Sequence, residues 1–164
     1  NGSCVLFSQQ NLIQQSGGKS VILARRSPYH LSENAMKYID MLREIGFWGL
    51  IMIEVRQPEP GKFIMIEANP RLWGPIQLVV DNKIDMFGML LRDNGFEITD
   101  VLEEDAQVEY YYWGGGITPG AQPLAFYHYT GEEFARNIQD FRVHDIYLRE
   151  DTQKIYFHEL GIIE

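Results

Sequence analysis

Two glutamates of a predicted β-hairpin are the side chains in this sequence that are best placed to do chemistry. Apolar strands are expected over residues 50–55 and 62–69, and the segment between them ends in Glu59-Pro60-Gly61-Lys62. Pro and Gly at the two central positions are typical of a type II turn. Counting outward from that turn places Glu54 directly opposite Glu67, unless a bulge shifts the count by one residue. Opposed residues of an antiparallel pair point to one face, with side-chain bases about 4.5–5.5 Å apart.

The same face is expected to carry Asn69, two residues beyond Glu67. Opposed carboxylates on otherwise apolar strands repel each other and lose hydration. Such an arrangement persists when a cation lies between them or a proton is shared. Carboxylate and amide oxygens are hard ligands, which suit Mg²⁺ or Mn²⁺ better than zinc. The sequence therefore predicts that Glu54, Glu67 and Asn69 are metal ligands.

An arginine follows these ligands almost at once. Pro70 disfavours helical backbone at Asn69 and so keeps the end of the strand extended. The guanidinium of Arg71 is a permanently charged bidentate donor, which suits a phosphate or carboxylate oxygen. Paired acids for magnesium, followed by an arginine for an anion, are what phosphoryl chemistry on a nucleotide requires.

The hairpin is expected to lie within one unit that spans residues 1–95. Ser32 is a good N-cap and Gly46 a good residue to follow a helix, so the apolar spacing between them predicts a helix over residues 33–45. The other predicted elements are a strand at 4–8, a polar loop over 9–19, a strand at 21–24, and a helix over 75–91 that breaks near Asp81-Asn82 or Asp85 and ends at Asp93-Asn94-Gly95.

The remainder, residues 96–164, is predicted to be a small α+β extension packed on the first unit. The fold class is therefore α+β, with an antiparallel sheet and flanking helices. The elements expected in the extension are an acidic loop over 97–107, an aromatic strand at 108–113, glycine-rich loops, a helix over 131–141, and a closing hairpin with strands at 145–148 and 154–157 and Asp151-Thr152 near its tip.

Composition limits the class of protein. The 164 residues are 45% hydrophobic and carry a formal charge of −9, which excludes a disordered or collagen-like chain and argues against a nucleic-acid binder. No apolar run reaches the roughly 18 residues of a membrane span, so a membrane partner is not expected. The single cysteine, Cys4, fits a reducing compartment, and we expect a cytoplasmic protein.

The segments Met52-Ile53-Glu54 and Phe63-Ile64-Met65-Ile66-Glu67-Ala68-Asn69-Pro70-Arg71-Leu72-Trp73-Gly74 together resemble the metal-binding segment of ATP-grasp enzymes. The branch they resemble is similar to the carbamoyl-phosphate synthase large subunit and is described as predicted ATP-grasp carboligases. The resemblance covers residues 1–95 and is to the C-terminal lobe of the ATP-grasp domain.

The resemblance implies a role for each of these residues. Glu54 and Glu67 would bind the two magnesium ions that bridge the ATP phosphates, and Asn69 would complete the second metal site. Arg71 would be the catalytic residue that contacts the transferred phosphate or the acyl-phosphate. The activity implied is that of a ligase with small-molecule carboxylate and amine substrates: the carboxylate is activated as an acyl-phosphate, the amine attacks it, and ADP and phosphate are released.

The family's N-terminal lobe, which carries the phosphate-binding lysines, the glycine-rich flap and the adenine hinge, precedes the segment matched here. Asn1-Gly2 is a hairpin-turn pair with no strand before it, so we expect a cut edge and a missing lobe; an Asn-Gly-Ser tag scar is the alternative. The chain by itself is then expected to bind ATP weakly or not at all. Exposed edges would favour a homo-oligomer.

Several alternatives stay open at this stage. A module that keeps the ATP-grasp fold but serves binding, regulation or assembly is the second functional hypothesis. Arg25-Arg26 could reach the phosphates or form a solvated surface pair, and Tyr110-Tyr111-Tyr112-Trp113 could be a half-buried strand or a substrate surface. Gly17-Gly18-Lys19-Ser20 fails as a phosphate loop, because Ile13 stands where that motif needs a glycine.

Overall fold

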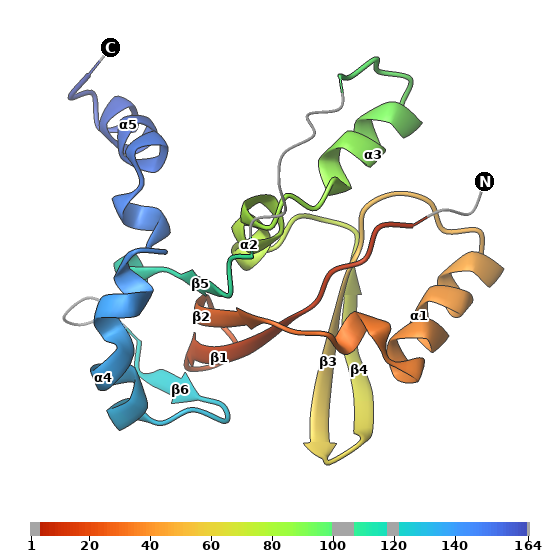
Figure 1. Cartoon of the computed structure of the whole chain (residues 1–164), viewed down its shortest axis with the longest axis horizontal. Coiled ribbons are helices and arrows are strands. Elements are labelled where there is room, and N and C mark those ends of the chain that lie inside the picture. Colours follow the sequence, from red (N-terminus) through yellow and green to blue (C-terminus); the bar gives the residue numbers. More distant parts are fainter. Residues whose placement is uncertain (1–3, 100–106, 118–121, 164) are drawn as a thin grey trace. The chain divides into compact units, whose positions relative to one another are not determined.

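The computed structural model describes residues 4–99, 107–117 and 122–163 of an α+β protein with antiparallel sheets and flanking helices (Figure 1). The chain divides into two compact units, one of Asn1–Ser8 with Ser27–Gln107 and the other of Gln9–Arg26 with Val108–Glu164. These units interleave along the sequence, whereas the expected boundary at residue 95 is sequential. The physical reason is strand pairing, which joins residues 9–26 to strands beyond residue 108.

The second unit is built on a four-stranded antiparallel sheet. Its strands, in the spatial order β5-β2-β1-β6, are β5 (Tyr110–Tyr112), β2 (Val21–Arg26), β1 (Gln9–Gln15) and β6 (Leu124–Phe126). The strands predicted at 21–24 and 108–113 are confirmed, the second of them in a shorter form. The structure adds β6, which the sequence analysis missed.

The sequence prediction for the first strand is wrong. Residues 4–8 have no regular structure, and β1 occupies the first part of the segment predicted to be a loop. Leu12 and Ile13 are fully buried at the centre of β1, which pairs with β2 on one side and β6 on the other. Its glutamines lie at the two ends of the strand, and at one of these ends the Gln14 amide donates to the Lys19 carbonyl at 2.8 Å. Two ladders and a buried centre outweigh the polar composition.

One helix covers the core of this unit. Helix α4 (Gly131–Arg142) confirms the helix predicted over 131–141 and begins with a capping box between Thr130 and Glu133. Phe134 and Phe141 are its buried residues, and their rings stack 6.0 Å apart. Both pack against Tyr112 of β5. The core of this unit therefore combines these aromatic rings with the buried aliphatic side chains of β1 and β2.

The closing hairpin predicted at the C-terminus is wrong. The structure has a short 3-10 helix, η4 (Ile146–Leu148), followed by helix α5 (Glu150–Glu159). Asp151-Thr152, expected at a hairpin tip, lie in the first turn of α5. Acidic residues favour that end of a helix, and Glu150 pairs with Lys154 one turn later at 2.7 Å. No helix in the described part of the chain is long and apolar enough to cross a membrane.

The first unit carries the predicted helices. Helix α1 (Glu33–Glu44) begins where expected, with the Ser32 hydroxyl accepting from the Ala35 N–H, and Gly46 follows it with φ +68°. The helix predicted over 75–91 is broken as expected, into η2 (Gly74–Ile76), α2 (Gln77–Asp81) and α3 (Met86–Asp93). Two further short elements are η1 (Tyr29–Leu31) in this unit and η3 (Gly114–Gly116) in the other.

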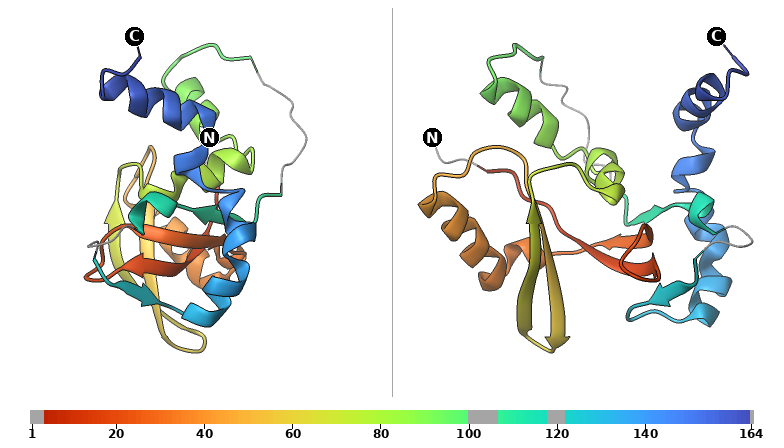
Figure 2. Two further views of the ribbon diagram at one scale, coloured as in Figure 1. Left: turned by 90° about the vertical axis from the view of Figure 1, so that its left-hand side faces the viewer. Right: turned by 180° about the vertical axis from the view of Figure 1, so that it is seen from behind.

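The predicted hairpin is present as β3 (Met52–Glu59) and β4 (Lys62–Asn69). The two strands form a sheet of their own, and both views in Figure 2 show them as a two-stranded ribbon. Gly61 adopts φ +77° at the turn, as a type II turn requires. Asn1-Gly2 and most of the predicted acidic loop over 97–107 lie outside the described residues.

Candidate functional site

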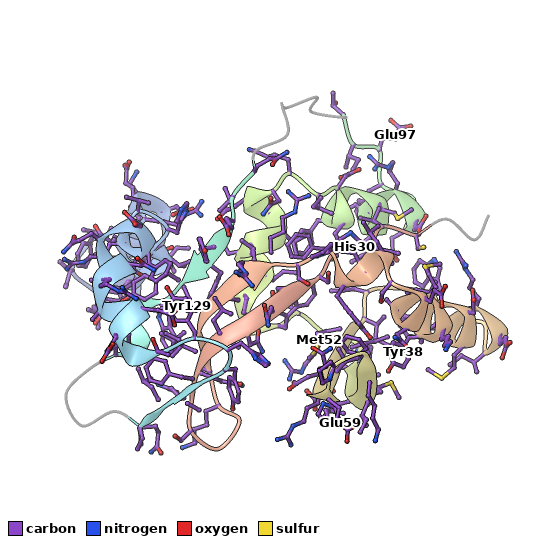
Figure 3. All side chains as sticks on the ribbon, turned by 60° about the horizontal axis from the view of Figure 1, so that its bottom comes forward. His30, Tyr38, Met52, Glu59, Glu97 and Tyr129 are labelled. Carbon is purple, nitrogen blue, oxygen red and sulfur yellow. The ribbon has the colours of Figure 1, made fainter. Side chains whose placement is uncertain are left out.

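The register of the β3–β4 hairpin places the two glutamates opposite each other. Glu54 pairs with Glu67, and the next pairs toward the open end are Ile53 with Ala68 and Met52 with Asn69. This confirms the predicted pairing. Figure 3 labels Met52 and Glu59, which mark the two ends of β3.

The pairs between the turn and the glutamates do not follow the predicted register. Val55 pairs with Met65 and Arg56 with Ile64, one residue out of step, because each strand contains one irregularity. In β3 the extra residue falls between Arg56 and Glu59, around Pro58, which has no N–H to give to a ladder. In β4 it is Ile66. The two bulges lie on opposite strands and cancel, so Glu54 still faces Glu67.

This register defines a carboxylate face of the hairpin. It carries Met52, Glu54 and Arg56 from β3, with their partners Asn69, Glu67 and Ile64 from β4. Residues alternate between the faces along each strand, so Val55 and Met65 point to the opposite face. Phe63, two residues from Met65, belongs to that opposite face as well.

The two carboxylates differ in exposure. Glu54 is half-buried, and Glu67 is exposed. The predicted loss of hydration is therefore wrong for Glu67, because its neighbours Met65 and Ile66 are themselves 39% and 54% exposed and do not cover it. Among the described residues neither glutamate has a hydrogen bond or an ion pair. The two glutamates face each other, and no cationic side chain of the described residues pairs with either of them.

Asn69 and Arg71 lie at the open end of the hairpin. The Arg71 N–H donates to the Asn69 carbonyl at 2.8 Å, which turns the chain immediately after β4. The Arg71 side chain is exposed, and its Nη1 donates to the carbonyl of Leu72 at 3.0 Å. Asn69 thus shares the carboxylate face, as predicted. The structure does not bring the guanidinium of Arg71 into an ion pair with either glutamate.

The opposite face of the hairpin is held by an aromatic contact that the sequence analysis missed. Phe63 packs on Tyr29 of η1 with ring centroids 4.6 Å apart. Burial, and then the neighbouring Tyr38 of α1, raises the pKa of Tyr29 to about 12. Tyr38 is labelled in Figure 3. Tyr29 therefore lies between the hairpin and α1 and helps to fix the strands that carry the carboxylates. An aromatic residue just before the helix N-cap was the only sequence signal for it.

The donor set suits a small hard cation. No group of three or more His, Cys, Asp or Glu side chains in the described part of the chain could hold a metal ion. Two carboxylates and an amide oxygen do fit Mg²⁺, which binds through one or two carboxylates and keeps several waters. Glu54, Glu67 and Asn69 could therefore hold magnesium only together with water or substrate oxygens. This is the arrangement expected where a metal bridges to a phosphate.

The other segments considered in the sequence analysis lie in the sheet of the second unit. Arg25 and Arg26 lie on β2, where the Arg25 side chain donates to the Gln10 amide oxygen at 3.0 Å. Tyr111 and Tyr112 are buried in β5, so this segment is the half-buried strand. Gly17 and Gly18 form the turn between β1 and β2, with φ near +79° and +73°.

Comparison with protein-family models, with curated proteins and with solved structures finds no match to this chain.

Proposed function

We propose that this chain is the C-terminal lobe of an ATP-grasp ligase that joins a carboxylate to an amine, with ATP and Mg²⁺ (or Mn²⁺) as cofactors. One observation carries the proposal: Glu54 lies directly opposite Glu67 in the hairpin register, with Asn69 on the same face. The ATP-grasp-like segment has these residues, with Arg71, at this spacing. The single cysteine supports a reducing, cytoplasmic setting.

Each residue has a separate task in this proposal. Glu54 and Glu67 would hold the divalent cation from opposite strands, and Asn69 would add a neutral oxygen ligand. Arg71 swings from the Leu72 carbonyl to the phosphoryl group and donates to its oxygens. When bound, the metal neutralises charge on the phosphates. The protein's own contribution is positioning and charge, since phosphoryl transfer asks little acid–base work of it.

The chemistry follows from an anionic substrate and a good leaving group. A carboxylate oxygen attacks the γ-phosphorus of ATP, the bond to the β-phosphate oxygen breaks, and an acyl-phosphate and ADP result. The amine then attacks the acyl carbon and expels phosphate, and the nitrogen loses a proton. Arg71 stabilises the same anionic oxygens in both steps, first on the moving phosphoryl group and then on the leaving phosphate.

The metal site is tested first on this chain alone. Titration with Mn²⁺, followed by the loss of its free electron-paramagnetic-resonance signal, should show a site that Glu54→Gln or Glu67→Gln weakens at least tenfold. Glu59→Gln is the matched control, because Glu59 is an exposed glutamate of the same hairpin that pairs with Lys62 at 3.9 Å. Equal Mn²⁺ affinity in all four proteins would refute the site.

The activity is tested on a protein that also has the preceding lobe. Carboxylate-dependent release of ADP should occur and should be lost in Glu67→Gln. This chain alone should bind Mg-ATP weakly, and tight binding would contradict its need for a second lobe. Absence of turnover with every carboxylate and amine, together with partner binding that Glu67→Gln leaves unchanged, would favour the non-catalytic module.

A further inference from the structure

An arginine that the proposed function does not use lies on the carboxylate face. Arg56 is two residues from Glu54 on β3 and pairs with Ile64 on β4. Because Val55 and Met65 point to the other face, Arg56 and Glu54 share one face. Two residues of extended strand separate their backbones by about 7 Å, which a guanidinium on its long side chain can span. The bulges change only the cross-strand partner of Arg56, which is Ile64, whereas an unbulged register would pair Arg56 with Met65.

Arg56 is exposed and forms no ion pair with Glu54 or Glu67. In the described part of the chain it forms no ion pair, although Glu54 and Glu67 are its nearest acidic neighbours on that face. The other cation of the hairpin behaves differently, because Lys62 pairs with Glu59 across the turn. Arg56 therefore has five N–H donors available on the face where the metal is proposed to bind.

The two arginines lie on either side of the carboxylate pair along the hairpin. Asn69 pairs with Met52 at the open end, and Arg71 follows Asn69 there. Arg56 lies beyond Glu54 in the opposite direction, toward the turn. A metal held by Glu54 and Glu67 would have Arg56 on the turn side and, once Arg71 turns from the Leu72 carbonyl, a second guanidinium on the other side. A linear anion that bridges the metal would meet one guanidinium with each of its ends.

We propose that Arg56 is a binding residue for the phosphate oxygens of a metal-bound polyphosphate, and that it takes the end of the polyphosphate that Arg71 does not reach. The inference rests on the proposed function, because it needs the metal on the carboxylate pair. Arginine fits this task better than lysine, since its planar fork donates two parallel hydrogen bonds to a phosphate. Arg56 and Arg71 together balance the negative charge that the metal leaves on the phosphates.

Inorganic tripolyphosphate is the probe, because it carries the phosphate chemistry without the adenosine that the other lobe would hold. The chain is loaded with Mn²⁺ and titrated with tripolyphosphate, and water-proton relaxation reports the ternary complex. Arg56→Ala should not weaken the affinity for Mn²⁺ alone, because it removes a cation near the metal, and should lower the affinity for tripolyphosphate about tenfold, the effect of one lost charge-assisted contact. The tripolyphosphate affinity of Arg56→Lys should lie between those of wild type and Arg56→Ala, because lysine keeps the charge but lacks the planar pair of donors.

The controls separate the possible failures. Lys62→Ala removes an exposed cation of the same hairpin and should leave both affinities unchanged, since its surface ion pair contributes little. Unchanged tripolyphosphate affinity in Arg56→Ala, with normal Mn²⁺ binding, overturns the Arg56 assignment and leaves the metal site standing. An equal loss in Lys62→Ala also overturns it, because the effect is then general charge. Mn²⁺ binding that Glu54→Gln and Glu67→Gln do not weaken overturns the proposed function and this inference together.

Discussion

Removing one of the two facing charges should stabilise the hairpin when no metal is present. Glu54 and Glu67 are opposed in the register, and Glu67 is exposed. Two unit charges about 6 Å apart in a dielectric close to that of water repel by about 0.7 kcal/mol. Salt at about 0.15 M has a Debye length near 8 Å and roughly halves this repulsion. Glu67→Gln should therefore stabilise β3–β4 by about 0.7 kcal/mol at low salt and about 0.3 kcal/mol at physiological salt.

Amide hydrogen exchange measures this locally, without requiring the whole chain to unfold in one step. A gain of about 0.7 kcal/mol slows exchange of the β3 and β4 ladder amides about threefold. Glu59→Gln is the matched control, because it removes a charge that faces Lys62 and should give no added protection. Unchanged or faster exchange in Glu67→Gln at low salt would refute the reasoning, as would a gain that does not shrink with salt.

Magnesium should make the hairpin of the wild type more stable than that of Glu67→Gln, the reverse of the order without metal. A metal present at ten times its dissociation constant stabilises the state that binds it by about 1.4 kcal/mol, which slows exchange about tenfold. The wild-type hairpin should gain this protection, whereas Glu67→Gln should gain little because one ligand is lost. Equal responses to magnesium would show that the carboxylate face does not hold the metal.

Three further predictions concern the second unit. Burial, and then the charge of Asp145, raises the pKa of Tyr111 to about 12, so the folded state keeps the neutral phenol while the unfolded state ionises near pH 10. The neutral Tyr111 phenol therefore contributes fully to the free energy of unfolding below pH 10, and this contribution is lost as the pH rises toward 12. Denaturant titrations between pH 10 and 12 should show the free energy of unfolding of wild type falling by about 2–3 kcal/mol more than that of Tyr111→Phe. Thr130→Ala removes the cap of α4 and should lower the free energy of unfolding by about 1 kcal/mol in urea titrations. Gly116→Ala would push a methyl group into the side chains of Ile22 and Trp113 and should destabilise by about 1–3 kcal/mol in the same assay.

The parts of the fold that sequence predicted well are governed by local rules. Ser32 and Gly46 define the ends of α1, and Pro60-Gly61 defines the turn of the hairpin. Each of these signals acts within a few residues, so reading it does not require knowledge of a long-range partner. The pairing of Glu54 with Glu67 was predicted from the turn alone, and it holds because the bulges on the two strands cancel. The intervening pairs, and hence the cross-strand partner of Arg56, needed the structure.

The parts that sequence predicted poorly depend on distant partners. β1 is polar in composition and becomes a central strand because β2 and β6 pair with its two edges. Nothing near β1 indicates β6, which is more than a hundred residues away along the chain. The C-terminal segment has apolar residues at spacings that suit a strand or a helix, and its acidic first turn and the pair of Glu150 with Lys154 favour α5. Aromatic support of the hairpin by Tyr29 is also a tertiary contact, and the turn chemistry gives no hint of it.

The carboxylate pair is the electrostatically unfavourable part of the hairpin. The turn of the hairpin, its bulge at Pro58 and the packing of Phe63 on Tyr29 all favour the observed register. Only the facing glutamates oppose that register, and a one-residue slip would separate them. Arg56 could neutralise one of them, yet it forms no ion pair among the described residues. Natural sequences tend to break local rules at functional sites. In the proposed function the compensating charge would come from a ligand, and a divalent cation that carries an anionic group would be a partner for both acids and for Arg56.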